Sequence, residues 1–369
     1  MPSALFYLGG VNREIGYVAK PAAEGIAAFL LDLDTGAARP LDVTKGIDNP
    51  TFVAVSPDGR MLAAVSEVGD WNEGLVTAYE IDPTSGALRY CNKQPTGGAH
   101  SCHIGFHPSA HHLGVANYGG LPPIERPNRS FSLYPLTGDT LGAPSAAVTH
   151  RGQGGDAERQ SRPHAHCVRW SPDGRFVVVA DLGIDRLLVY RFDAESGGVE
   201  PHGEVALKAG AGPRHVQFHP SLPVLYCVNE LDCTLANIAY DAKAGALELI
   251  ATGSTLARDG HADSSCSAIA ITRDGKHLYV GNRGDDSIAR FSLDPRDGTA
   301  TLLGTTPAGG RVPRDLALDP SGTILAVANQ ESDQVRLFRY RAESGDLEAI
   351  GMPIAAGSPT AIAFHPQLR

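Results

Sequence analysis

Short apolar segments that lead into a turn of the Ser-Pro-Asp-Gly type recur along the chain. They are TFVAVSPDG (51–59), CHIGFHPSA (102–110), HCVRWSPDG (166–174), RHVQFHPSL (214–222), SAIAITRDG (267–275), RDLALDPSG (314–322) and TAIAFHP (360–366). Each of the first six is followed by a second apolar run, such as FVVVADL, and by a third, such as LLVYRFD. Short runs rich in β-branched residues and separated by turn signals are typical of antiparallel strands.

The repeat predicts the architecture. Repeats of roughly 50 residues with four strands each are the blades of a β-propeller. Six blades are contiguous, and the seventh is split between TAIAFHP near the C-terminus and ALFYLGG and GIAAFLLDLDTG near the N-terminus. Pairing of strand 360–366 with strand 4–10 would close the ring and remove an open sheet edge. We therefore predict an all-β, seven-bladed β-propeller with residues 1–369 in one domain; an open two-sheet sandwich is the alternative.

Composition narrows the compartment and the partners. The net charge is −10 and no Lys/Arg-rich block is present, which disfavours nucleic acid and anionic membranes as partners. The start of the sequence lacks the pattern of a secretory signal, and no apolar run is long enough to span a bilayer. The six cysteines lack CxxC spacing. We expect them to be reduced and mostly buried, in a cytoplasmic protein.

The repeat also predicts where a site would lie. Each turn of this type joins the innermost strand of a blade to the next strand, so the start of the first and the end of the second meet at one mouth of the central channel. The starts of the inner strands place there Thr51, Cys102, His166, Arg214, Ser267, Arg314 and Thr360. The ends of the second strands place there Glu67, Tyr118, Leu182, Glu230, Arg283 and Gln330. The residue type differs from blade to blade, as an asymmetric ligand would require.

Two long connections open on the same face, 143–163 and 119–129, and long ordered loops on a rigid scaffold often carry function. Polar residues at a propeller mouth can also be merely solvated or paired between blades.

The residue types at the mouth suit hydrolysis of an ester. Arg214, Arg283 and Arg314 offer charged donor forks for an anion or a developing oxyanion. Glu230 could act as a general base, and His166 could protonate a leaving oxygen. The candidate substrate-binding residues are Arg314, His164, His103, Tyr118, Glu67 and Gln330.

No cofactor is expected, because the sequence has no phosphate-binding glycine loop, HExxH or GxSxG motif. His164 and His166 alternate on one strand but lack an evident third ligand, so we predict no metal site.

Several of these segments carry a resemblance to a known family. RQSRPHAHCVRWSPDG, GAGPRHVQFHP, VNELDCT, NRGDDSI and GRVPRDLALDPSG resemble the lactonase family of seven-bladed propellers, which includes propeller-type 6-phosphogluconolactonases and carboxy-cis,cis-muconate cyclases. The resemblance runs from about residue 4 to the C-terminus and implies metal-free action on a lactone. It also implies a site made of His166, Arg214, Glu230 and Arg283. The sequence departs from the family pattern at Ala268, Ala270 and Asp285.

The leading hypothesis is therefore hydrolysis of a small anionic sugar lactone, with 6-phosphogluconolactone as the best candidate. Three fixed positive charges at one mouth favour an anionic substrate over a neutral one. The alternatives are a muconate-type lactone cycloisomerase, a neutral aldonolactonase and a non-catalytic propeller that binds proteins. The sequence leaves the oligomeric state open.

Overall fold

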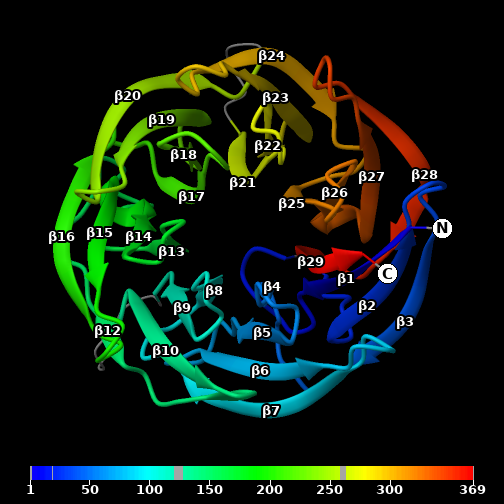
Figure 1. Ribbon diagram of the computed structural model, residues 1–369, viewed down its shortest axis with the longest axis horizontal. Coiled ribbons are helices and arrows are strands. Elements are labelled where there is room, and N and C mark those ends of the chain that lie inside the picture. Colours follow the sequence, from blue (N-terminus) through cyan, green and yellow to red (C-terminus); the bar gives the residue numbers. More distant parts are fainter. Residues whose placement is uncertain (1, 19, 120–127, 258–262, 369) are drawn as a thin grey trace.

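The computed structural model describes residues 2–18, 20–119, 128–257 and 263–368. Its strands form seven antiparallel sheets that surround a central channel, and the two ends of the chain meet in one sheet (Figure 1). The first sheet contains β29 (Pro359–Leu368), β1 (Ser3–Gly10), β2 (Ile26–Asp32) and β3 (Ala38–Thr44), and the second contains β4 (Val53–Val55), β5 (Met61–Ser66), β6 (Leu75–Ile81) and β7 (Leu88–Pro95). The third sheet contains β8 (Ser101–Phe106), β9 (His112–Asn117), β10 (Phe131–Thr137), β11 (Thr140–Leu141) and β12 (Ala146–Val148). The fourth contains β13 (Ala165–Trp170), β14 (Phe176–Asp181), β15 (Arg186–Phe192) and β16 (Val199–Ala206).

The fifth sheet contains β17 (Pro213–Phe218), β18 (Val224–Asn229), β19 (Thr234–Asp241) and β20 (Ala246–Ser254). The sixth contains β21 (Ser265–Ile271), β22 (His277–Arg283), β23 (Ser287–Leu293) and β24 (Ala300–Pro307). The seventh contains β25 (Pro313–Leu318), β26 (Ile324–Asn329), β27 (Gln334–Tyr340) and β28 (Leu347–Ala355). Two short 3₁₀ turns, η1 (Leu182–Ile184) and η2 (Gln330–Ser332), follow β14 and β26. Among the described residues, no helix is both long and apolar enough to cross a membrane.

The ring closes as the sequence predicted. Strand β1 pairs antiparallel with β29, with Phe6 opposite Phe364 and Leu8 opposite Ile362. The prediction of seven blades is confirmed, with one difference in the third. Its outer strand is broken into β11 and β12, which both pair with β10. Gly142 and Pro144 lie between the two pieces, and a proline has no N–H to continue a ladder.

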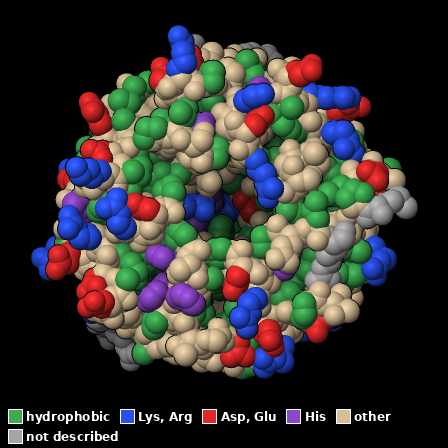
Figure 2. Space-filling model, in the orientation of Figure 1, with side chains coloured by type: hydrophobic (Ala, Val, Ile, Leu, Met, Phe, Trp, Pro, Cys, Tyr) green, Lys and Arg blue, Asp and Glu red, His purple; other side chains and the backbone are tan. Residues whose placement is uncertain are grey.

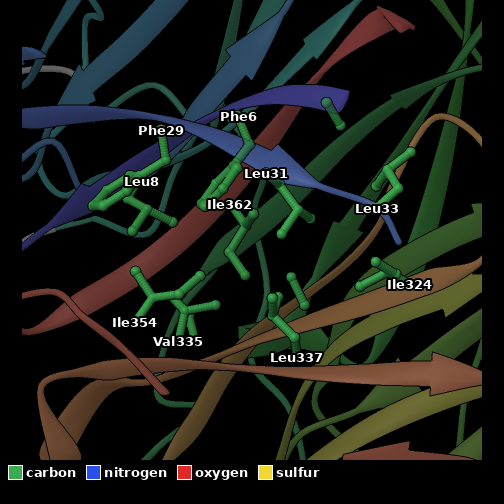
Figure 3. Packing of buried hydrophobic residues seen from close by; sticks show 13 residues of the cluster. Phe6, Leu8, Phe29, Leu31, Leu33, Ile324, Val335, Leu337, Ile354 and Ile362 are labelled. Carbon is green, nitrogen blue, oxygen red and sulfur yellow. The ribbon is translucent and has the colours of Figure 1, made fainter. Parts of the chain in front are cut away.

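Apolar side chains pack between neighbouring blades, which are thereby held in a ring. One such cluster joins β1 and β2 to β26, β27 and β28. Figure 3 shows Phe6 and Phe29 on one side of this cluster and Val335 and Ile354 on the other. The second strand of each blade is buried on both faces, as in the run FVVVAD of β14, whereas the outermost strands are mostly exposed.

The recurring Ser-Pro-Asp-Gly turn has a local hydrogen-bonding reason. The hydroxyl of Ser56 donates to Asp58 at 2.6 Å and accepts from the backbone N–H of Met61 at 3.0 Å. Gly59 ends the turn at φ +75°, a left-handed conformation that favours glycine. Ser171, Asp173 and Gly174 repeat the arrangement between β13 and β14. These turns lie at the end of the channel opposite the strand starts, so the candidate site residues share the other mouth.

Candidate active site

The inner strands carry a repeated irregularity where the candidate residues lie. In β8, β13, β17 and β25 the pairing register skips one residue near the strand start, and that residue is Cys102, His166, Arg214 or Arg314. In β29 the skipped residue is Thr360. A β-bulge leaves one residue unpaired and re-aims its side chain. The bulges therefore turn the residues at this register toward the channel.

The channel mouth holds a cavity of about 1050 Å³. Figure 2 shows that the ring is hollow at its centre and that basic and acidic side chains lie in and around the hollow. Most of the predicted site residues line the cavity together with Cys102. There are seven of them in all: Glu67, Tyr118, His164, His166, Glu230, Arg283 and Arg314. Arg214 lies directly beneath, on the wall of a small second cavity of about 20 Å³ that His166 and Arg314 also line.

Two predicted binding residues lie elsewhere. His103 is 1% exposed and stacks against Phe52 with ring centroids 4.4 Å apart, below the cavity rather than in its wall. Because its neighbour Cys102 occupies the bulge, His103 points into the packing between blades. Gln330 is buried in η2, where its amide donates to the carbonyl of Tyr17 at 3.4 Å, and it does not line the cavity either.

Glu230 is the centre of the charged network. Its Oε2 atom accepts a hydrogen bond from Arg214 Nε at 3.0 Å and forms an ion pair with Arg283 Nη2 at 2.9 Å. Oε1 accepts from Arg159 Nη2 at 2.8 Å. The three predicted arginines are thus not an uncompensated arc of charge, because a carboxylate lies between two of them.

The network fixes the charge of the carboxylate. Burial would raise the pKa of Glu230, but the guanidinium groups of Arg283 and Arg214 outweigh that effect and hold the pKa well below its ordinary value. Burial, together with the positive charges of Arg314 and Arg283, lowers the pKa of Arg214 to about 9. At neutral pH Glu230 is therefore an anion whose lone pairs are already engaged by arginine donors.

His166 is in the opposite electrostatic situation. Burial, and then the nearby charge of Arg214, lowers the pKa of His166 well below its ordinary value, while Glu230 raises it in part. Its Nδ1 atom is buried without a hydrogen-bond partner among the described residues. The ring is neutral at physiological pH and can accept a proton, in contrast to the predicted role of proton donor in the resting state.

Arg314 lies on the other side of the cavity in a second network. Its guanidinium lies 4.6 Å from the ring centroid of Tyr17, and the Tyr17 hydroxyl donates to Glu67 at 2.9 Å. Glu67 also accepts from Thr51 at 2.6 Å. Burial by itself would lower the pKa of Arg314, but Tyr17 and Glu67 outweigh that effect and raise the pKa above its ordinary value. Arg314 is therefore charged and already has a counter-ion nearby.

The long connections contribute residues that the strand register could not predict. Part of the predicted loop 143–163 is strand β12, and the segment after that strand supplies Glu158, Arg159, Ser161 and Arg162 to the cavity wall. Residues 120–127 of the second long connection lie outside the described residues. Tyr17, in the segment between β1 and β2, was also missed, because no repeat relates that segment to the other blades.

The sequence departures and the possible metal ligands can also be placed. Ala268 and Ala270 lie in an apolar cluster with Leu316 and Leu325 between two blades, away from the cavity. Asp285 accepts a hydrogen bond from the Ser287 hydroxyl. Within the described ranges, no three His, Cys, Asp or Glu side chains come together as they would to hold a metal ion.

Comparison with known proteins gives consistent matches along nearly the whole chain. The family model described as lactonase, 7-bladed beta-propeller, matches residues 12–364. A Bacillus subtilis protein named 6-phosphogluconolactonase is 31% identical over 362 residues, covering 97% of this chain and 100% of the relative. A Formosa agariphila protein of the same name is 31% identical over 349 residues, covering 93% and 96%. The solved structure of the periplasmic gluconolactonase PpgL from Pseudomonas aeruginosa matches with a TM-score of 0.88 at 28% identity, covering 98% of this chain and 99% of that one.

Proposed function

The chain belongs to the lactonase family of seven-bladed β-propellers and is a lactone hydrolase, and we propose that it opens a sugar lactone that carries an anionic group, with 6-phosphogluconolactone as the best candidate. The observation that carries the proposal is the buried group of Glu230, Arg214 and Arg283 beside a neutral His166 at the cavity. The relatives named 6-phosphogluconolactonase support the phosphorylated substrate, and the neighbour named gluconolactonase supports the same ester class without a phosphate.

The electrostatics favour His166 as the group that moves the proton. The oxygens of Glu230 are already engaged by three arginines, whereas the Nδ1 atom of the neutral His166 ring has no partner among the described residues and can accept a proton. A neutral imidazole can take the proton from a water molecule as that water attacks the lactone carbonyl carbon. The resulting imidazolium then gives the proton to the ring oxygen as the C–O bond of the ester breaks. One water is consumed, and one acid and one hydroxyl are formed.

In this mechanism, the arginines stabilise the negative charge that develops on the carbonyl oxygen. Arg214 Nη1 donates to the carbonyl of Ser267 at 2.7 Å, and Arg283 Nη2 donates to the carbonyl of Cys266 at 2.8 Å. These bonds and the bonds to Glu230 hold both guanidinium groups before substrate arrives. Donors already fixed in place need no reorganisation as charge develops. Arg283 Nε is buried without a partner among the described residues, which leaves a donor unused by the protein.

Glu230 then acts as a positioning residue and as a fixed counter-charge. It orients two arginines, and its charge favours the imidazolium form of His166 that exists between the two proton transfers. The role that the sequence suggested for Glu230, general base, passes to His166 in this proposal. The role suggested for His166, protonation of the leaving oxygen, is retained as the second half of the cycle.

Hydrolysis in water enriched in heavy oxygen tests the function. We expect acid release from 6-phosphogluconolactone in a pH-stat, above the spontaneous rate, with one solvent oxygen in the product carboxylate. A muconate-type cycloisomerase would act on its lactone without incorporating solvent oxygen. Absence of enzymatic acid release from phosphorylated and plain gluconolactone alike would refute the proposed function and leave a non-catalytic propeller as the better description.

A further inference from the structure

Arg162 is held at the cavity by a rigid stretch of loop. Just before it, Gln160 is fully buried and its amide donates to the carbonyl of Leu182 and to Asp185, both at 2.6 Å. Just after it, the backbone N–H of His164 donates to Asp181 at 2.7 Å. Gly183 packs so closely that a Cβ there would lie 1.9 Å from the carbonyl oxygen of Arg162. The backbone of Arg162 is thus fixed on both sides, although it belongs to a loop.

Among the described residues, the guanidinium of Arg162 has no counter-ion. It lines the cavity, and no residue that the structure describes forms an ion pair or a side-chain hydrogen bond with it. Its Nε atom is buried and unpartnered. Burial lowers the pKa of Arg162, which is the change expected when no carboxylate nearby offsets the cost of burying the charge. By contrast, Arg159 on the same loop is committed to Glu230, and Arg314 lies beside Tyr17 and Glu67.

The surroundings of Arg162 add further donors. Arg159 Nη2 lies 3.3 Å from the Tyr118 hydroxyl, and the Tyr118 ring stacks on His164 with centroids 4.3 Å apart. Arg162 and His166 are four positions apart along the chain, which limits their Cα separation to about 14 Å. A six-carbon sugar acid and an arginine side chain can together bridge that span. The wall between the two residues is therefore suited to a substrate with its ester at His166 and an anionic group at the far end.

We propose that Arg162 is a specificity-determining residue that binds the phosphate or carboxylate group of the substrate at the outer part of the cavity, remote from the ester. The inference rests on the proposed function for the reaction itself and goes beyond it in naming the anion subsite. The planar donor fork of arginine pairs with two oxygens of a phosphate, and no described residue uses the donors on Arg162. Arg214 and Arg283 are left to the carbonyl oxygen.

Arg162→Gln tests the assignment, with Arg151→Gln as the matched control. Arg151 is exposed on the same loop and does not line the cavity. For each protein, kcat/KM is measured on 6-phosphogluconolactone and on glucono-δ-lactone. We expect Arg162→Gln to lower the ratio of the two values at least tenfold, mainly through KM for the phosphorylated lactone, because a remote anion is held equally in the ground and transition states. The control should leave both values unchanged.

A binding measurement separates this inference from the proposed reaction. Calorimetric titration with 6-phosphogluconate and with gluconate requires no turnover. We expect the phosphorylated acid to bind the parent protein more tightly, and Arg162→Gln to abolish most of that difference. An unchanged kinetic ratio together with an unchanged binding difference would overturn the anion subsite, even for an active lactonase. Selective binding that depends on Arg162 in a protein without turnover would overturn only the proposed reaction.

Discussion

Replacing Glu230 with glutamine tests the central charge network, because the change removes a charge and keeps the shape. The side chains of Arg214 and Glu230 are 3% and 7% exposed, so their ion pair is buried. Removing one partner of a buried pair costs about 3–5 kcal/mol, since the other charge stays buried and uncompensated. A glutamine oxygen can still accept one of the arginine hydrogen bonds, which places the expected loss of unfolding free energy near 3 kcal/mol. The bridge to Arg159, whose side chain is 46% exposed, adds less than about 1 kcal/mol.

The same substitution should lower kcat by about 100-fold or more. It frees both arginines from their positions and removes the charge that favours the imidazolium form of His166. Urea denaturation measures the first effect and initial rates in a pH-stat measure the second. Glu204→Gln is the control, because Glu204 pairs with Arg186 at the surface at 2.6 Å, and its loss should change stability by no more than about 0.5 kcal/mol. Parental turnover by Glu230→Gln, with stability within that margin, would refute the reasoning.

Three further predictions follow from the same structure. His166→Gln should lower kcat/KM at least about 100-fold. The pH–rate profile of the parent protein should be flat near pH 7 and should decrease only in acid, because the lowered pKa of His166 keeps the base neutral. A rate that already decreases, as the solution is acidified, at pH values above 6.5 would contradict this assignment. The pKa values of His103, His166 and His215 are all lowered by burial, so their contribution to stability is complete above about pH 6.5 and is lost as pH falls toward their folded values. Asp315, whose pKa burial raises to about 6, acts in the opposite direction below that pH. We therefore expect the unfolding free energy to decrease as pH falls from 7 to 5, and a constant unfolding free energy over that range would disprove it. Deleting residues 360–369 should remove the strand that pairs with β1 and abolish a single cooperative thermal transition; an unaltered transition would show that the ring does not depend on this closure.

Strand register predicted most of the site, because the repeat turns sequence position into position around a ring. Once the blade length is known, the residue that begins each inner strand must lie at one mouth. That logic placed His166, Arg214 and Arg314 beside Glu230 and Arg283 without knowledge of any contact. The bulges decide which of two adjacent residues faces the channel. In β8 the bulged residue is Cys102, which lines the cavity, and its neighbour His103 does not.

Other parts of the site depend on contacts that no repeat encodes. Arg159 reaches Glu230 from 71 positions away along the chain, through a loop whose path depends on Gln160 and Asp185. The sequence marked the loop as long but could not show which of its residues would face the cavity. Tyr17 reaches Glu67 from a segment that occurs once in the chain. The proton-transfer roles also depended on the structure, because only the three arginine contacts show that Glu230 is a weak base.

The arginines explain why acid and base assignments cannot be made from residue types here. A glutamate beside a histidine usually suggests a carboxylate base and an imidazolium acid. In this cavity the charge of Arg214 lowers the pKa of both partners, so Glu230 stays ionised and His166 stays neutral over the same pH range. A site in that state can accept a proton at the histidine and still supply a negative charge to stabilise the imidazolium that results. Since the ester needs one proton removed from water and one delivered to the leaving oxygen, a single ring poised in this way can perform both transfers.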